Sequence, residues 1–234
     1  MAEAWARQRR SWAVRYVERG DLSDALVAPA LIETFAQGWA QLRGLPPPER
    51  IGTALMIETG QPSEQRRYIF PEPPGDISAR AAIIDQPLIL LKAAIDPDAM
   101  AALLAPGWHV EQTGTTMTTD CLPVTEPVLS AGLTLDSAWQ GPVFAVHIRD
   151  SNGSEAGRGR MTLINGWAQH DSIAVAAPYQ RRGLGTAVMM ALGREARARG
   201  VDQGLLNATV AGRALYQQLG WIARAPWTTA QIRA

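Results

Sequence analysis

The first 120 residues alternate between apolar positions spaced as on a helix and apolar positions spaced as on a strand. Helical spacing predicts an amphipathic helix over residues 1–18 and a second helix over about 24–42. Three prolines at 46–48 then form a stiff extended spacer. The other elements predicted in this half are strands and one short helix: strands 53–59, 67–70, 87–94 and 110–119, and a helix over 98–104.

A different pattern begins after the segment Asp120–Pro127, which we take as the boundary between a first part, 1–122, and a second part, 123–234. Four strands come first in the second part, over 128–135, 143–149, 157–163 and 167–175. After Val175 the spacing predicts helix, strand, helix, strand: a helix from Leu184 that stops at Gly200, a strand over 204–208, a helix over 210–219 and a last strand. The order indicates a mixed α/β fold.

Composition narrows the class of protein. Of 234 residues, 47% are hydrophobic and 19% charged, which excludes a disordered or fibrous chain. Lys and Arg, 22 together, balance 22 Asp and Glu, so no strong field draws the chain to nucleic acid or a membrane surface. One cysteine, Cys121, excludes a disulfide framework and a Cys-rich metal site. With neither a secretory signal nor a long apolar run, we expect a soluble, cytoplasmic protein.

The strand that ends at Val175 is followed by the string QRRGLG, residues 180–185, from which a helix begins. Free N–H groups at a helix N-terminus, together with the helix dipole, form an anion site. Glycines at 183 and 185 allow close approach of a pyrophosphate, and Arg181 and Arg182 add positive charge. An ordinary strand–turn–helix is the alternative. The string is neither a P-loop nor a dinucleotide fingerprint, because it lacks Gly-Lys-Ser/Thr and a third glycine.

A second string, LYQQLGW at 215–221, lies one strand and one helix further on. With both strings in place, residues 125–234 resemble the GNAT N-acetyltransferase superfamily. The acyl-CoA loop of that family reads Gln/Arg-x-x-Gly-x-Gly/Ala, and its second signature ends in a Leu-Tyr-x-x-Leu-Gly-Phe type string, here with Trp221 for Phe. One departure is Thr209, which stands where the family often has Asn, while Asn207 comes two residues too early.

The resemblance implies a mixed sheet that is splayed open in its middle and flanked by helices, with an N-terminal helical or α+β extension. Acetyl-CoA would lie in the opening as co-substrate, with no metal. The backbone of Ile173 and Val175 would bond the pantetheine arm, and Tyr216 would sit near the thioester sulfur. The pyrophosphate would be held by seven consecutive residues, namely Gln180, Arg181, Arg182, Gly183, Leu184, Gly185 and Thr186. The first part would supply a missing early strand and helices, or be a second, degenerate copy that ends near residue 120.

Acyl transfer to an amine needs a neutral nucleophile and a proton for the leaving thiolate. Tyr216 is the candidate acid, since a phenol is protonated at neutral pH; a tyrosine that only packs is the alternative. His170 and Asp171 open the splayed strand and are the candidate bases, and alternation lets only one of them face the cleft. A surface turn without chemistry is the alternative for both.

The sequence therefore predicts an N-acetyltransferase that moves an acetyl group to a primary amine, on a small molecule or a peptide, by direct attack in a ternary complex. Cys121 lies outside both motifs, which argues against a covalent route. A non-catalytic acyl-CoA-binding or sensing module is the alternative, and it would need neither Tyr216 nor a base. A homodimer paired through an exposed sheet edge stays open.

Overall fold

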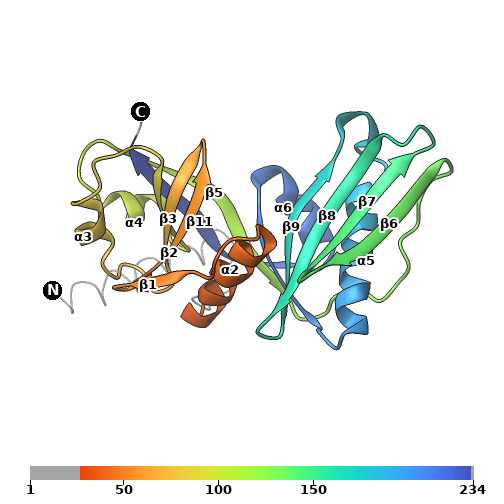
Figure 1. Ribbon diagram of the computed structural model, residues 1–234, viewed down its shortest axis with the longest axis horizontal. Coiled ribbons are helices and arrows are strands. Elements are labelled where there is room, and N and C mark those ends of the chain that lie inside the picture. The colour runs from red at the N-terminus through yellow and green to blue at the C-terminus, as the bar shows by residue number, and fades with distance from the viewer. Residues whose placement is uncertain (1–26, 233–234) are drawn as a thin grey trace.

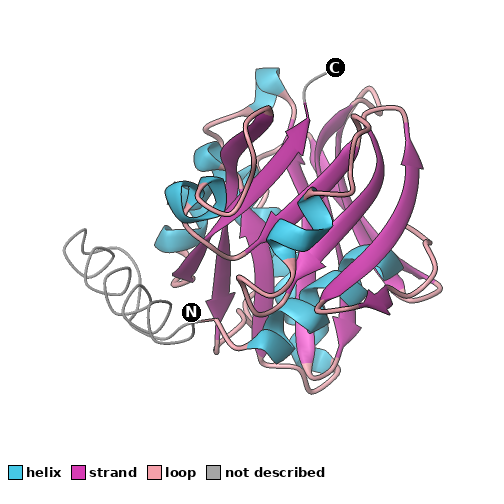
Figure 2. Ribbon diagram, turned by 90° about the vertical axis from the view of Figure 1, so that its left-hand side faces the viewer, coloured by secondary structure: helices cyan, strands magenta, loops and turns pink. Residues whose placement is uncertain are grey.

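The computed structural model describes residues 27–232, which form one mixed sheet with helices on both of its faces (Figures 1 and 2). The predicted helix over 1–18 lies outside these residues. The described helices are α2 (Pro29–Leu42), α3 (Ile77–Ala81), α4 (Pro97–Ala101), α5 (Leu184–Ala198) and α6 (Val210–Gln218), with a 3-10 turn, η1 (Ala177–Tyr179). The described strands are β1 (Glu49–Ile51), β2 (Ala54–Gln61), β3 (Glu64–Phe70), β4 (Ile89–Ala93), β5 (Trp108–Thr119), β6 (Leu133–Gln140), β7 (Val143–Asp150), β8 (Glu155–Ile164), β9 (Trp167–Val175), β10 (Gln203–Ala208) and β11 (Ile222–Ile232).

Most predicted elements are present, and the differences have local causes. The strand predicted over 128–135 instead runs over 133–140, because Gly132 takes a left-handed φ of 81° and turns the chain there. Helix α2 begins at Pro29, where the fixed φ of proline suits the first helical position. Asp96 caps α4 by accepting from the amide of Asp98, as its sequence context predicts. The five-residue α3 and the short β1 were not predicted.

The two halves of the chain repeat one order of elements. The first half runs β3–α3–β4–α4–β5 and the second half runs β9–α5–β10–α6–β11. In each, the first two strands pair in parallel. The last strand of each half lies in the other half, since the sheet order is β1-β2-β3-β4-β11-β5-β10-β9-β8-β7-β6. Strands β5 and β11 therefore cross the middle of the molecule as an antiparallel pair (Figure 1).

The first half thus gives the second half a late strand, β5, rather than an early one. It also gives the second half a helix, because α2 packs across β8 and β9: Gln41 donates to the hydroxyl of Thr162, and Gln169 donates to the carbonyl of Phe35. These bonds tie the two halves together around the sheet face that α2 covers.

Alternation along the strands separates the cores on the two faces. In β10, Leu206 packs with α5 and α6, whereas Leu205 packs with α2 and Trp227. A third core lies under α3 and α4 in the first half. Each fully buried leucine contributes roughly 1.5–3 kcal/mol, so both faces of the sheet are held by packing. No helix within residues 27–232 is long and apolar enough to cross a membrane.

Candidate active site

The sheet opens between the parallel strands β9 and β10. Their ladder has only three pairs and ends where Leu205 meets Gln169. Beyond that point β9 stays paired with β8 but is bent by a bulge at Ser172, which has a φ of 57°. The edge of β9 that faces β10 therefore leaves the ladder over residues 170–175. Such an edge offers backbone N–H and C=O groups to an extended chain that contains amides. Ile173 and Val175 lie on it, with their side chains packed on the α5 core.

The loop after β9 forms the N-terminus of α5. Gly183 is the N-cap, with a φ of 77°, and no side chain caps the helix, so the first-turn N–H groups point outward. Arg181 and Arg182 are exposed beside it, and the Gln180 amide donates to the carbonyl of Val175 at 3.3 Å. This is a helix-terminal anion site built from backbone N–H groups and two guanidiniums.

Glycine is required at the two loop positions for different reasons. No atom lies within 4 Å of the position that a Cβ on Gly183 would take, so the left-handed backbone is what requires glycine. A Cβ on Gly185 would come within 2.8 Å of Leu215 Cδ2 on α6. Gly185 therefore lets α5 and α6 pack closely, in addition to any approach by a ligand. Leu184 is buried and Thr186 half-buried in the first turn of α5.

Tyr216 lies on α6, whose N-terminus is capped by the Thr209 hydroxyl accepting from the amide of Gly212 at 3.1 Å. Its side chain is buried, and its ring centroid lies 6.1 Å from that of Trp221. Burial raises the pKa of Tyr216 to about 12, and the negative charge of Asp171 acts in the same direction. The phenol is therefore protonated at neutral pH.

The two candidate bases lie on opposite faces of β9. His170 faces the α5 side, where it is 2% exposed and its ring meets Trp221 edge-on at 5.2 Å. Its Nδ1 lies 2.9 Å from the carbonyl of Ala168, and its Nε2 is buried with no partner in the described part of the chain. Burial lowers the pKa of His170 to about 4, so the imidazole is neutral at pH 7. If His170 controls the rate, the fall in rate at acid pH would therefore lie well below pH 6.5.

Asp171 faces α2 and is held by two guanidiniums. Its carboxylate lies 2.8 Å from Arg160 Nη2 and 3.1 Å from Arg43 Nη1, and the Ser172 hydroxyl donates to it at 3.0 Å. Burial alone would raise the pKa of Asp171, but the two positive charges and these bonds outweigh burial and hold the pKa below its usual value. Asp171 is thus an ionised carboxylate, and its ion pairs fix its orientation.

Three residues near the opening were missed or undervalued at the sequence level. Arg43 and Arg160 come from α2 and β8, and no local motif marks them; only the packing of α2 and the register of β8 bring them to Asp171. Asn207 was noted only as displaced from its family position. In the structure both ends of its amide are buried, without a partner among residues 27–232.

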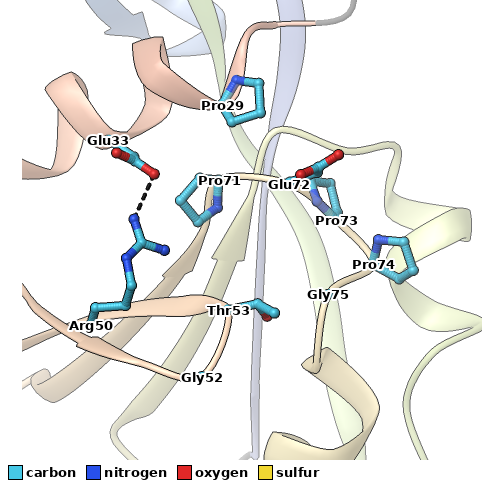
Figure 3. A pocket seen from close by; sticks show the side chains of 10 residues that line it. All are labelled: Pro29, Glu33, Arg50, Gly52, Thr53, Pro71, Glu72, Pro73, Pro74 and Gly75. Atoms are coloured by element: carbon cyan, nitrogen blue, oxygen red, sulfur yellow. Dashed lines mark hydrogen bonds and ion pairs between the residues drawn. The ribbon is translucent and has the colours of Figure 1, made fainter.

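A hollow of about 410 Å³ lies in the first half at the end of β3 (Figure 3). It occupies the place that the loop after β9 has in the second half. Its wall is made of prolines, glycines, one threonine and charged residues: Pro29, Glu33, Arg50, Gly52, Thr53, Pro71, Glu72, Pro73, Pro74 and Gly75. The Arg50 guanidinium donates a hydrogen bond to the Glu33 carboxylate, and the Asp76 carboxylate after the loop accepts one from the Thr53 backbone amide. Carboxylates at this loop make it a poor anion site.

Metal-ligating side chains do not gather anywhere in the described chain: no group of three or more His, Cys, Asp or Glu residues within 27–232 is placed to hold a metal ion.

An open mixed sheet whose central parallel pair separates beside an anion-binding helix N-terminus is the architecture of the acyl-CoA-dependent acyltransferases, and the chain has this class of fold. Residues 142–223 match the family model described as the acetyltransferase (GNAT) domain. This part of the chain therefore carries a GNAT acetyltransferase domain. No curated protein matches it in sequence.

Solved structures agree on the fold. A GCN5-related N-acetyltransferase from Kribbella flavida superposes with a TM-score of 0.65 at 15% identity, covering 89% of this chain and 96% of that one. An acetyltransferase of the GNAT family from Novosphingobium aromaticivorans has a TM-score of 0.55 at 16% identity, with coverage of 87% and 96%. A tandem GNAT protein from the clavulanic acid biosynthesis pathway has a TM-score of 0.54 at 15% identity, with coverage of 79% and 80%.

Proposed function

We propose that this chain transfers an acetyl group from acetyl-CoA to a primary amine by direct attack in a ternary complex. The observation that carries the proposal is the junction of two features: the uncapped N-terminus of α5 at Gly183 and the unpaired edge of β9 beyond Gln169. The helix N-terminus suits a pyrophosphate, and the strand edge suits the amides of a pantetheine arm. They follow each other along the chain, as the two parts of CoA would require.

The residues at this junction fit acetyl-CoA. Backbone N–H groups of the loop Gln180 to Thr186, with Arg181 and Arg182, would hold the pyrophosphate. The backbone of Ile173 and Val175 would bond the pantetheine arm as a neighbouring strand does. Acetyl-CoA supplies the activated acyl group, a thioester whose carbonyl carbon accepts a nucleophile.

In the reaction, the amine nitrogen forms a bond to the thioester carbonyl carbon, and the carbon–sulfur bond then breaks. The Tyr216 phenol, which is protonated at neutral pH, donates its proton to the leaving thiolate. The amine must lose a proton. Asp171, on the α2 side, and His170, on the α5 side, remain the two candidates to receive it.

Binding of acetyl-CoA, measured by calorimetry, tests the first part of the proposal, the acetyl-CoA site. Gly183→Asp and Gly183→Asn form a matched pair, because both side chains tolerate a left-handed backbone and have the same shape. An anion site predicts that the added negative charge weakens acetyl-CoA binding roughly 30- to 100-fold more than the neutral amide does. Equal affinities for the two variants would contradict the anion site.

Release of CoA thiol in the presence of a panel of primary amines tests the second part of the proposal, the transfer of the acetyl group. Turnover that depends on the amine supports acetyl transfer. Tight acetyl-CoA binding without turnover on any amine of the panel would instead favour the non-catalytic acyl-CoA-binding module.

A further inference from the structure

The side of the opening that α2 covers is lined by polar side chains from three elements. Gln169 and Leu205, the last paired residues of β9 and β10, both face α2. Two positions further on, alternation puts Asp171 and Asn207 on the same face, one on each side of the opening. Helix α2 ends beside them, since its C-cap residue Arg43 reaches the Asp171 carboxylate. An acceptor that enters from this side meets these groups first.

Positive charge exceeds negative charge at this place. One carboxylate, Asp171, is shared by two guanidiniums, Arg43 and Arg160. A third guanidinium, Arg67, stacks on the Trp39 ring at 3.4 Å, and Arg43 stacks on the same ring at 3.8 Å. Arg67 forms an ion pair with Glu64, so it does not change the excess of positive charge around Asp171.

Both guanidiniums at Asp171 are still within reach of a ligand. The side chains of Arg43 and Arg160 keep 28% and 30% of their exposure. Each guanidinium has five N–H donors, and one shared carboxylate cannot use them all. A net positive, partly exposed pair of guanidiniums repels a simple ammonium ion and binds a carboxylate or a phosphate.

Asn207 adds unmet hydrogen-bonding capacity on the other side of the opening. Its amide nitrogen and oxygen are both buried without a partner in the described chain, and so is the hydroxyl oxygen of Thr116, its register partner on β5. Leaving buried polar atoms without a partner is unfavourable, and a polar ligand at this point would supply the missing hydrogen bonds.

We propose that the acceptor amine carries its own anionic group, a carboxylate or a phosphate, which Arg43 and Arg160 bind while the amine lies between Asp171 and Asn207. This inference rests on the proposed acetyl transfer. An α-amino acid has the required chemistry, because its ammonium group suits Asp171 and its carboxylate suits the two guanidiniums. Arg43 and Arg160 are thus specificity-determining residues.

The test compares amines that differ only in the anion. Each of the common L-amino acids is assayed beside its α-carboxamide, and O-phosphoethanolamine beside ethanolamine, by CoA release from acetyl-CoA. We expect the charged member of a pair to have the higher kcat/KM, although the amine of a carboxamide is the less basic and more often the free base. The amino acid arm and the phosphoethanolamine arm distinguish a carboxylate from a phosphate.

Arg43→Gln and Arg160→Gln should raise KM for the charged acceptor by about tenfold or more, as expected for loss of a charge-assisted hydrogen bond. KM for the uncharged partner should change little. A purely structural role of these residues would weaken both members of a pair equally. Arg194→Gln is the control, because Arg194 lies on α5 and forms an exposed ion pair with Glu126, which is in the loop before β6.

The possible failures can be told apart. Absence of turnover with every amine, charged or neutral, would overturn the proposed acetyl transfer itself. Turnover that is as fast or faster with the uncharged member of every pair would overturn only the inference about the anion. So would an unchanged preference for the charged member in folded Arg43→Gln and Arg160→Gln variants.

Discussion

The two halves of this chain share one order of strands and helices but differ at the loop that leads from the first parallel strand into the next helix. In the second half, a glycine cap leads into α5, a helix of 15 residues, with two exposed arginines at its start. In the first half, the counterpart loop carries three prolines and Glu72, and leads into α3, a helix of only 5 residues that follows Asp76 (Figure 3). On the proposed function, an anion site in this frame requires a helix long enough to have a dipole and an N-terminus free of carboxylates.

The exchange of β5 and β11 between the halves predicts that the second half does not fold without the first. Expressed alone, residues 123–234 should show no cooperative unfolding transition, because β5 fills the place between β10 and β11. In the intact chain β5 has five register pairs with β10 and ten with β11. Co-expression with 1–122 should restore the transition. A sharp thermal melt of the 123–234 fragment alone, followed by circular dichroism, would show that the halves fold independently.

A second difference between the halves is Tyr216 on α6, since α4, the counterpart helix, contains only Pro97–Ala101 and no tyrosine. Tyr216→Phe should lower kcat by roughly 100-fold through loss of the general acid, while acetyl-CoA affinity changes little. Single-turnover kinetics, which isolate the chemical step, provide the measurement. An unchanged rate of that step would leave Tyr216 a packing residue.

Each half also buries a basic side chain whose pKa is lowered, and the two should affect stability at opposite ends of the pH scale. In the second half, burial lowers the pKa of His170 to about 4, below the usual 6.5. The unfolded chain therefore binds the proton first as the pH falls, and stability should drop by roughly 2 kcal/mol between pH 6 and pH 4. His170→Asn keeps a donor for the Ala168 carbonyl and should abolish this part of the drop in urea titrations. An identical pH dependence in the variant would contradict the lowered pKa.

In the first half such a group is Lys92, the chain's only lysine. Its ammonium donates to the Thr229 hydroxyl at 3.0 Å, and burial, reinforced by Arg67, lowers its pKa to about 8. Above that pH the folded protein loses the proton before the unfolded chain does, so stability should rise by roughly 1.5 kcal/mol between pH 8 and pH 9.5. Lys92→Met should flatten this rise. A rise that persists in the variant would assign it to other groups.

The sequence was most informative where a motif is local. The loop 180–185 and the string 215–221 are continuous in the chain, so their resemblance to a family can be seen in the sequence, and a helix cap such as Asp96 depends only on neighbours within one turn. The exchange of β5 and β11 could not, because strand order is decided by pairing between residues more than 100 positions apart. Arg43 and Arg160 were missed for the same reason, since only tertiary packing brings them to Asp171. The lowered pKa of His170 also depends on burial against Trp221, which alternation alone does not reveal.

The exchanged strands have a consequence for synthesis of the chain. Strand β11 is the last described element, yet it lies at the middle of the sheet, between β4 and β5. While the ribosome is still making residues 123–221, β4 and β5 have no neighbour on the edges that β11 later covers. The nascent chain therefore displays two open strand edges for the time needed to translate about a hundred residues, roughly 5–20 seconds. Protection of those edges by a chaperone, or rapid closure once β11 emerges, is then a condition for yield in the cell.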